Sequence, residues 1–428
     1  MNWTLIKILL IVFAFLNLQN NDLFVNAKNG NSTKDEPTDH IITRLPAGFK
    51  ILKKVIHGIR MKLLDTVVDL IHDIGNKTDL NKLEKCYSSE FGDRQLNLFQ
   101  MPLHDVIYDY FTSGDHDHLF LSDSKFEIRQ RLIIFVQNVK TLLHLIQKCL
   151  ISPYEEQMVM GITTLSHLSD HEYKQMLNKE LYNKPLKLDN NNAQHKNITS
   201  STSCIDPGPV VIPDEFDWNE KGKVTPIKQQ FICGSCFIFS AVAVVESAYL
   251  IHGKTNLKPE EIDISEQAIL DCMNPDVCRT GGWPTQAWMT MAHQGIVDEE
   301  DAPYMSMYTG GCKAYPKSKI NYRIVNWCDD VYNTDDFIQR FILKHGPVFA
   351  AVDASGKEWK HNKGVFRAQC GKKLSHAIVI TGWTKQYWII KNSWGLNWGI
   401  NGYLYLPRGQ NKCGINSVIG VPFGMITP

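Results

Sequence analysis

The number of cysteines constrains this chain more than any other feature. Its 428 residues contain 11 cysteines, an odd count. Lys7 is followed by a short apolar run and by "VNA" at 25–27, a pattern typical of a secretory signal peptide. Secretory compartments favour disulfides, so the odd count predicts bridges and one free thiol. If Cys236 is that thiol, an even set of ten remains, and spacing alone does not fix its pairing.

The first 27 residues are therefore expected to form a signal peptide. The alternative is an N-terminal anchor, but the apolar run is shorter than a membrane span requires. No later segment is apolar enough to cross a bilayer, so no stable membrane insertion is expected. N-glycosylation triplets begin at Asn31, Asn76 and Asn197. Together these features predict a product of the secretory pathway, either extracellular or lysosomal.

The composition is that of an ordinary globular protein. Hydrophobic residues make up 43% and charged residues 21%, and the formal net charge is +0. Nothing in this balance favours a nucleic-acid partner. The length leaves room for more than one folding unit. We expect a monomer with no cofactor and no metal site.

The N-terminal half contains two candidate helices and a linker. Residues 50–74 place apolar side chains at helical spacing, with basic residues on the other face. Such a helix could lie on a membrane surface, but packing inside a larger unit is favoured. Residues 127–146 form a second helix candidate, because residues at helical spacing fall on one stripe, namely Glu127, Arg131, Phe135, Asn138, Leu142 and Ile146. The polar stretch 190–203 is interpreted as a linker, which places a boundary near residues 195–212.

After the boundary the pattern changes to one long helix followed by strands. Residues 236–252 predict a buried helix that ends at Gly253. Short apolar or alternating runs at 346–354, 376–383, 387–394 and 402–407 predict strands. Helices first and strands later indicate an α+β unit with two halves.

One constellation of residues carries nucleophilic chemistry. "CGSC" at 233–236 places Cys236 at the start of the predicted helix, and His376 and Asn392 follow it by 140 and 156 residues. A thiol attacks a carbonyl as a thiolate, which a helix N-terminus and a protonated imidazole stabilise. The alternatives are a redox pair, a zinc site and a core histidine. A redox pair needs a thioredoxin-like context, and zinc needs more ligands at close spacing.

The stretches "VTPIKQQFICGSCFIFSA", "ISEQAILDC", "GGWP", "SHAIVITGW" and "YWIIKNSWGLNWGINGY" resemble papain-family cysteine peptidases. The resemblance covers about residues 212–428. It implies a papain-like α+β fold, with a helical half and a β-barrel-like half, preceded by a helical prosegment. It implies that Cys236 is the nucleophile, His376 the base and acid, and Asn392 the orienting group. Gln230 would complete the oxyanion hole, and Trp394 would shield the Asn–His contact.

The same resemblance implies substrate contacts. Gly281 and Gly282 match positions that bind the substrate backbone as an extended strand. The walls of the pocket for the second residue before the cut would be Trp283, Pro284, Ala351, Ala377 and Val418. All are apolar, so an apolar residue is expected there. Because no His-His insertion separates Gly282 from Cys312, endopeptidase activity is favoured over carboxydipeptidase activity.

The region before residue 204 resembles a cathepsin L-type propeptide. Its motif positions are Glu127, Arg131, Phe135, Asn138 and Leu142, and residues 161–173 resemble the stretch that follows. We therefore expect a signal peptide at 1–27, a helical pro-extension at 28–120, an inhibitory propeptide with linker at 121–203 and a peptidase domain at 204–428. The expected partners are protein or peptide substrates, the chain's own prosegment as inhibitor, and cystatin-type inhibitors.

Similarity also implies disulfides. The implied pairs are Cys233–Cys278, Cys272–Cys312, Cys370–Cys413 and, as in mite group 1 allergen peptidases, Cys204–Cys328. Cys86 and Cys149 are the two cysteines that have neither an implied partner nor an implied catalytic role.

Two departures concern the active region: Phe237 replaces a usual Trp, and Phe231 stands where a glycine is usual. A glycine often marks a positive φ. A non-catalytic binding homologue is the competing hypothesis.

Overall fold

The computed structural model describes residues 62–91, 94–113, 125–153, 157–182, 204–253, 257–331 and 333–425. The chain divides into two units, Met1–Ile151 and Ser152–Pro428. The expected signal peptide, residues 50–61 of the first predicted helix, Asn31, Asn197 and the expected linker all lie outside the described residues. Within the described ranges, no helix combines the length and the apolarity that a bilayer span requires.

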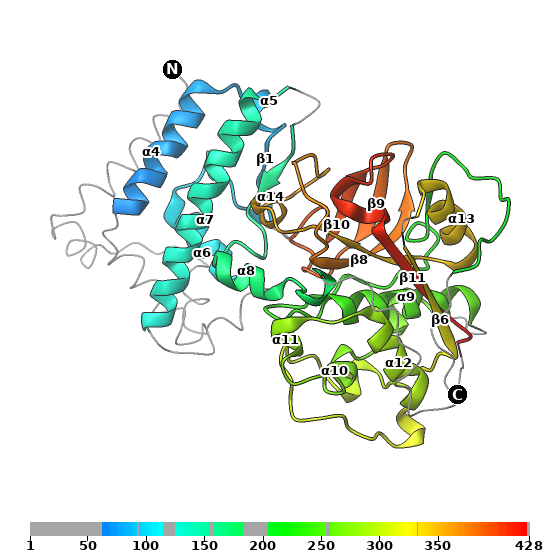
Figure 1. The fold of residues 1–428 in the computed structure, drawn as a ribbon. Coiled ribbons are helices and arrows are strands. Elements are labelled where there is room, and N and C mark those ends of the chain that lie inside the picture. The colour runs from blue at the N-terminus through cyan, green and yellow to red at the C-terminus, as the bar shows by residue number, and fades with distance from the viewer. Residues whose placement is uncertain are drawn as a thin grey trace, which may run out of the picture. The chain divides into compact units, whose positions relative to one another are not determined.

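Unit 1 is mainly helical. Its elements are α4 (Lys62–Lys77), α5 (Leu80–Leu83), β1 (Tyr87–Ser88), β2 (Glu90–Phe91), β3 (Arg94–Gln95), α6 (Leu103–Phe111) and α7 (Lys125–Ile151). The prediction for 127–146 is confirmed by α7. Helix α4 packs against α7 (Figure 1) and buries Val67 and Ile74 of the predicted apolar stripe. The described part of the first predicted helix is therefore a packed helix, as favoured.

An aromatic cluster and a disulfide hold unit 1 together. The rings of Tyr110 and Phe135 lie 4.5 Å apart, and Phe91 lies 5.2 Å from Tyr110. Buried aromatic pairs of this kind add to the stabilisation that comes from area burial. Cys86 is bonded to Cys149, which ties the segment after α5 to the end of α7. Asn76, an expected glycosylation site, is exposed near the end of α4.

Unit 2 contains a helical half and a sheet half (Figure 1). Its helices are α8 (Asp170–Met176), α9 (Cys236–His252), α10 (Glu266–Leu270), α11 (Val277–Thr280), α12 (Pro284–Gln294), α13 (Asp335–His345) and α14 (Lys357–Lys360). Its strands are β4 (Met160–Gly161), β5 (Phe216–Asp217), β6 (Asn326–Val331), β7 (Val348–Val352), β8 (His376–Trp383), β9 (Tyr387–Lys391), β10 (Tyr403–Pro407) and β11 (Val418–Phe423).

The main sheet of unit 2 is antiparallel and open. Its order is β10-β9-β8-β7-β11-β6, and β5 pairs with β8. The four strands predicted from the sequence are β7, β8, β9 and β10, and the α+β class is confirmed. The sheet corresponds to the expected β-barrel-like half but is not a closed barrel: in the part of the chain that the structure describes, the end strands β10 and β6 do not pair. A barrel requires every strand to have two neighbours.

Helix α9 is the centre of unit 2. Every residue from Cys236 to Leu250 is buried, as expected for a helix that is apolar on all sides. It packs against β8 and β11 on the sheet side and against α12 on the helical side. The helix ends at His252 with Gly253 as its C-cap, as predicted. This central position holds Cys236, its first residue, between the two halves.

Residues 157–182 belong to unit 2. Met160 forms a bridge with Asn362, and the N–H of Gly161 donates to His361 O at 2.9 Å. The hydroxyl of Thr164 donates to Trp394 O at 2.7 Å. The structural division after Ile151 therefore lies within the expected propeptide, not at the linker. The processing boundaries remain a prediction.

Candidate active site

Cys236 occupies the N-terminal end of α9. Ser235 is the N-cap residue, and its side chain makes no capping bond. The first N–H groups of the helix thus point towards the sulfur with the positive end of the helix dipole. The Sγ of Cys236 accepts a hydrogen bond from Ala377 N–H at 3.4 Å, and its exposed fraction is 0%. The sulfur therefore lies beside the residue that follows His376.

His376 and Asn392 come together because β8 and β9 are antiparallel neighbours. His376 begins β8 and Asn392 follows β9, and the ring Nε2 lies 2.7 Å from Asn392 Oδ1. An amide oxygen accepts only, so Nε2 carries the proton and Nδ1 is left to accept. In the described residues, Nδ1 has no hydrogen-bond partner. The indole of Trp394 stacks on the His376 ring at 4.4 Å and covers this pair.

Burial opposes ionisation of both groups in this state. It raises the pKa of the Cys236 thiol to about 12, despite hydrogen bonds from Ala377 and Asn178 that favour the thiolate. It lowers the pKa of His376 to about 4, although the bond to Asn392 favours the charged ring. The uncharged thiol and imidazole are thus favoured. Removing either charge from water costs more than these hydrogen bonds return, so burial opposes the ionised forms of both groups while residues 176–178 are in place.

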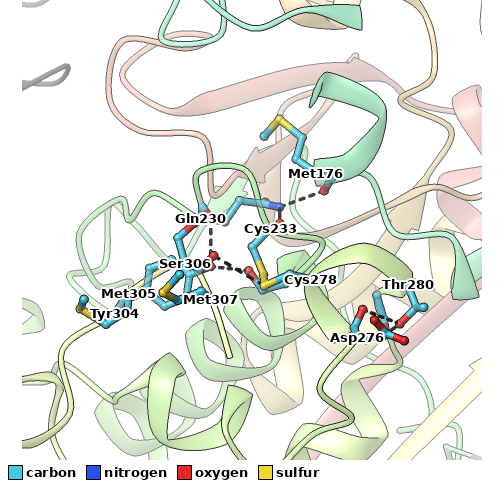
Figure 2. The surroundings of a disulfide bond; sticks show 12 residues. Met176, Gln230, Cys233, Asp276, Cys278, Thr280, Tyr304, Met305, Ser306 and Met307 are labelled. Atoms are coloured by element: carbon cyan, nitrogen blue, oxygen red, sulfur yellow. Dashed lines mark hydrogen bonds between the residues drawn. A yellow bond between two sulfur atoms is a disulfide. The ribbon is translucent and has the colours of Figure 1, made fainter. Parts of the chain in front are cut away.

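Both polar atoms of the Gln230 side chain make hydrogen bonds. Its Nε2 donates to Cys233 O at 2.8 Å and to Met176 O at 3.1 Å (Figure 2). Its Oε1 accepts from Ser393 Oγ at 2.7 Å. Its exposed fraction is 0%. The carbonyl of Met176 therefore occupies one of the two N–H directions of the Gln230 amide. An oxyanion would need that same donor.

The segment after α8 contacts the glycines expected to bind substrate. The N–H of Lys179 donates to Thr280 O at 3.0 Å. Gly281 has a φ of +79°, and a Cβ built there would lie 2.1 Å from Asn178 Oδ1. No pattern in the sequence predicted a role for Met176 or Asn178. The stretch that resembles a pro-region, 161–173, ends before these two residues.

The five expected pocket walls are buried. Ala351 of β7 and Ala377 of β8 are partners in register, and Val418 begins β11, which also pairs with β7. Trp283 and Pro284 lead into α12, and Trp283 is 7% exposed. The three residues of the sheet thus lie on neighbouring strands. The remaining two, Trp283 and Pro284, lie at the start of α12.

The two departures from the family pattern have visible consequences. Phe231 adopts a φ of +51°, in the left-handed region that favours glycine. Phe237 is fully buried, and a Cβ built on Gly282 would lie 2.7 Å from its ring Cζ. The smaller Phe ring therefore still requires a glycine at 282.

The disulfides agree with the pairs implied by similarity. The structure contains Cys204–Cys328, Cys233–Cys278, Cys272–Cys312 and Cys370–Cys413, together with Cys86–Cys149. Cys236 is the remaining free cysteine, and all 11 cysteines lie within the described ranges. One sulfur is thus left available for chemistry.

Comparison with known proteins gives a family match. Residues 212–423 match the papain family cysteine protease model. Fruit bromelain from Ananas comosus is 36% identical over 214 residues, which are 48% of this chain and 58% of that protein. Pro-cathepsin H from Bos taurus is 31% identical over 275 residues, which are 61% of this chain and 77% of that protein. The alignment with pro-cathepsin H is longer than the expected peptidase domain of this chain, so it also includes residues before that domain.

Solved structures agree with these relatives. Procathepsin L2 from Tenebrio molitor larval midgut aligns with a TM-score of 0.58 and 28% identity, covering 70% of this chain and 94% of that one. A structure from work on the mite allergens Blo t 1 and Der p 1 aligns with a TM-score of 0.58 and 25% identity, covering 75% and 98%. With a family match over residues 212–423 and a 31% identical relative that is covered to 77%, the chain belongs to the papain family of cysteine proteases.

Proposed function

We propose that this chain is a cysteine endopeptidase made as a zymogen, with Cys236 as nucleophile. The observation that carries the proposal is the free sulfur at the start of α9, which contacts the residue after His376. The Nε2 of His376 lies 2.7 Å from Asn392 Oδ1. The other ring nitrogen, Nδ1, has no hydrogen-bond partner among the described residues. A nucleophile, a base and an orienting group are the three parts of a catalytic triad.

In the proposed reaction, His376 Nδ1 takes the proton of the Cys236 thiol. The thiolate then attacks the carbonyl carbon of the scissile peptide bond. Gln230 Nε2 and the main-chain N–H of Cys236 stabilise the oxyanion. The C–N bond breaks as the imidazolium gives its proton to the leaving amine, which leaves a thioester on Cys236. Water, deprotonated by His376, hydrolyses the thioester and restores the thiol.

Latency follows from residues 176–178. Met176 O occupies the Gln230 donor, and Asn178 lies at the sulfur and at Gly281. Removal of this segment would readmit water and lower the cost of charge on both catalytic groups. The ion pair would then form in the mature enzyme. The prosegment would thus block the proposed active site and also favour the uncharged forms of Cys236 and His376.

The proposed substrate is an extended polypeptide with an apolar residue two positions before the cut. Gly281 and Gly282 would bind its backbone, and the buried apolar walls around Ala351 and Ala377 would take its side chain. A charged side chain would lose hydration there without gaining a partner. The preference is therefore set by desolvation.

We also propose a secretory-pathway location, lysosomal or extracellular, with glycans at Asn31, Asn76 and Asn197. Five disulfides support an oxidising compartment. The proposed mature form is a monomer that cystatin-type inhibitors would recognise at the same site. Processing would separate the signal peptide at 1–27 and the prosegment from the peptidase domain at 204–428.

The test is covalent labelling followed by kinetics. The zymogen is exposed to acid, treated with a peptidyl epoxide and digested, and the modified residue is mapped. We expect label on Cys236, none on Cys236→Ala, and faster cleavage of a Phe-Arg than of an Arg-Arg fluorogenic amide. Absence of label after the prosegment has been removed would favour the non-catalytic homologue. Faster Arg-Arg cleavage would refute the apolar pocket.

A further inference from the structure

Tyr304 contacts the oxyanion region from the helical half of unit 2. Its hydroxyl donates to the main-chain carbonyl of Gln230 at 2.9 Å and lies 2.7 Å from Ser235 Oγ. The Gln230 carbonyl can only accept, so the single proton of Tyr304 is directed to it. Ser235 therefore donates to Tyr304. One phenol thus connects Gln230 to the residue immediately before Cys236 (Figure 2 labels Gln230 and Tyr304).

The Gln230 carbonyl needs such a contact because of Phe231. The φ of Phe231 is +51°, a conformation that costs a residue with a Cβ more than it costs glycine. Rotation about that φ turns the peptide plane that carries the Gln230 carbonyl. Any relaxation of Phe231 to a negative φ would therefore swing this carbonyl and, with it, the root of the Gln230 side chain. The hydrogen bond from Tyr304 opposes that rotation directly.

Tyr304 is itself fixed on both sides. Its N–H donates to Glu299 Oε1 at 2.6 Å, and its ring packs edge-on against Phe239 of α9 at 4.9 Å. The other polar groups of Gln230 are bound by Ser393, Cys233 and Met176. When the prosegment leaves, the Met176 contact is lost, and the remaining partners must keep the amide aimed.

We propose that Tyr304 is a positioning residue for the oxyanion hole, holding the Gln230 main chain in place against the left-handed Phe231. This inference rests on the proposed role of Gln230. It assigns Tyr304 no contact with substrate. Its hydroxyl acts on the transition state through the direction of the Gln230 N–H, so its loss should lower kcat more than it changes KM.

The experiment uses the full chain, processed to the mature enzyme, with Cys236 counted by epoxide titration before each assay. Tyr304→Phe removes only the hydroxyl. We expect its kcat to fall about tenfold relative to the unaltered enzyme, because one oxyanion donor would be misaligned. Its KM should stay within about twofold of the unaltered value. Phe231→Gly removes the left-handed penalty, so Tyr304→Phe in that background should cost less than about threefold.

Tyr249→Phe is the matched control. That hydroxyl donates to Arg323 O at 2.8 Å and accepts from Arg323 N–H at 2.7 Å, far along α9 from Cys236. It should lower the melting temperature while leaving kcat unchanged. If Tyr304→Phe also lowers only the melting temperature, or if Phe231→Gly gives no rescue, the positioning role is wrong.

A second background separates this inference from the proposed function. In Gln230→Ala, Tyr304→Phe should cause no further loss of kcat, because the group that it aims is gone. If the unaltered enzyme is inactive, the proposed function fails. If the unaltered enzyme is active and Gln230→Ala is impaired, but Tyr304→Phe keeps full kcat, only the inference about Tyr304 fails.

Discussion

Asn178 Nδ2 donates a 2.6 Å hydrogen bond to the carbonyl oxygen of Gly282. The main-chain N–H of Asn178 donates to Ser375 O at 2.8 Å, so the same residue also binds the position before His376. Asn178 is fully buried, and its Oδ1 accepts from the N–H groups of Glu180 and Leu181. Asn178 of the 157–182 segment thus contacts both Gly282, proposed to bind substrate, and the residue before His376, the proposed base.

Replacement of Asn178 should weaken latency. In Asn178→Ala, the Gly282 carbonyl and two N–H groups lose a buried partner, at a cost of about 1–3 kcal/mol. The unprocessed zymogen should therefore react with a peptidyl epoxide about 10- to 100-fold faster. Lys174→Ala, an exposed change on α8, is the control and should leave the rate unchanged. Equal labelling rates for Asn178→Ala and the unaltered zymogen would contradict the assigned contact.

Removal of the Asn392 acceptor should lower kcat and change the pH profile. Asn392 Oδ1 favours the protonated ring, so Asn392→Ala should lower the His376 pKa and move the alkaline limb to lower pH. The loss of a hydrogen bond to a charged group is worth about 1.5–3 kcal/mol, so kcat should fall about 10- to 100-fold.

Asn392→Asp separates this effect from a change in packing. It keeps an acceptor oxygen and adds a negative charge, so it should retain more activity than Asn392→Ala and move the alkaline limb to higher pH. If the alkaline limb of the pH profile moved in the same direction in Asn392→Ala and in Asn392→Asp, Asn392 would not act on the His376 pKa.

The closed zymogen should lose stability as the pH falls. Burial lowers the pKa of His361 to about 3, and Lys360 beside it acts in the same direction. Lys360 donates to Leu168 O and lies 3.8 Å from Asp170, while Gly161 N–H donates to His361 O. A depressed folded-state pKa gives stability that is present above the unfolded value near 6.5 and is lost below it.

Between pH 6.5 and pH 4.5, His361 should therefore remove about 2–3 kcal/mol of unfolding free energy. His361→Gln should flatten this part of the stability curve, measured by urea titration of Cys236→Ala zymogen at each pH. His293→Gln, at an exposed position, serves as the control. A curve as steep in His361→Gln as in the unaltered zymogen would refute the assignment.

The Cys86–Cys149 disulfide should stabilise unit 1 alone. Paired Ala substitutions should lower its unfolding free energy by about 2–4 kcal/mol. Every tryptophan after Trp3 lies at or beyond residue 218, so tryptophan fluorescence reports on unit 2 while far-UV dichroism reports on both. The dichroism transition should shift to lower denaturant and the fluorescence transition should stay. Equal shifts would mean that the two units unfold together.

Local patterns in the sequence predicted the main elements well. The 236–252 helix has apolar residues on all sides, and β7, β8, β9 and β10 are short runs bounded by glycine or turn residues. Such signals depend on neighbours within a few positions, so they survive without tertiary information. The glycine normally found at Phe231 correctly pointed to a positive φ there. Whether the sheet closes could not be predicted in the same way, because closure depends on which edge strands meet, and no local pattern encodes that.

The amino-acid sequence by itself determined the odd thiol, the helix that begins at Cys236 and the family resemblance that singled out His376, Asn392 and Gln230. Only the tertiary structure decided that Met176 and Asn178 cover these groups, and that Tyr304 holds the Gln230 carbonyl. It also decided that burial shifts the pKa values of the Cys236 thiol and the His376 imidazole towards their uncharged forms. The physical reason is that burial and hydrogen-bond partners are set by residues distant in sequence, and the energy of a charge depends on what surrounds it.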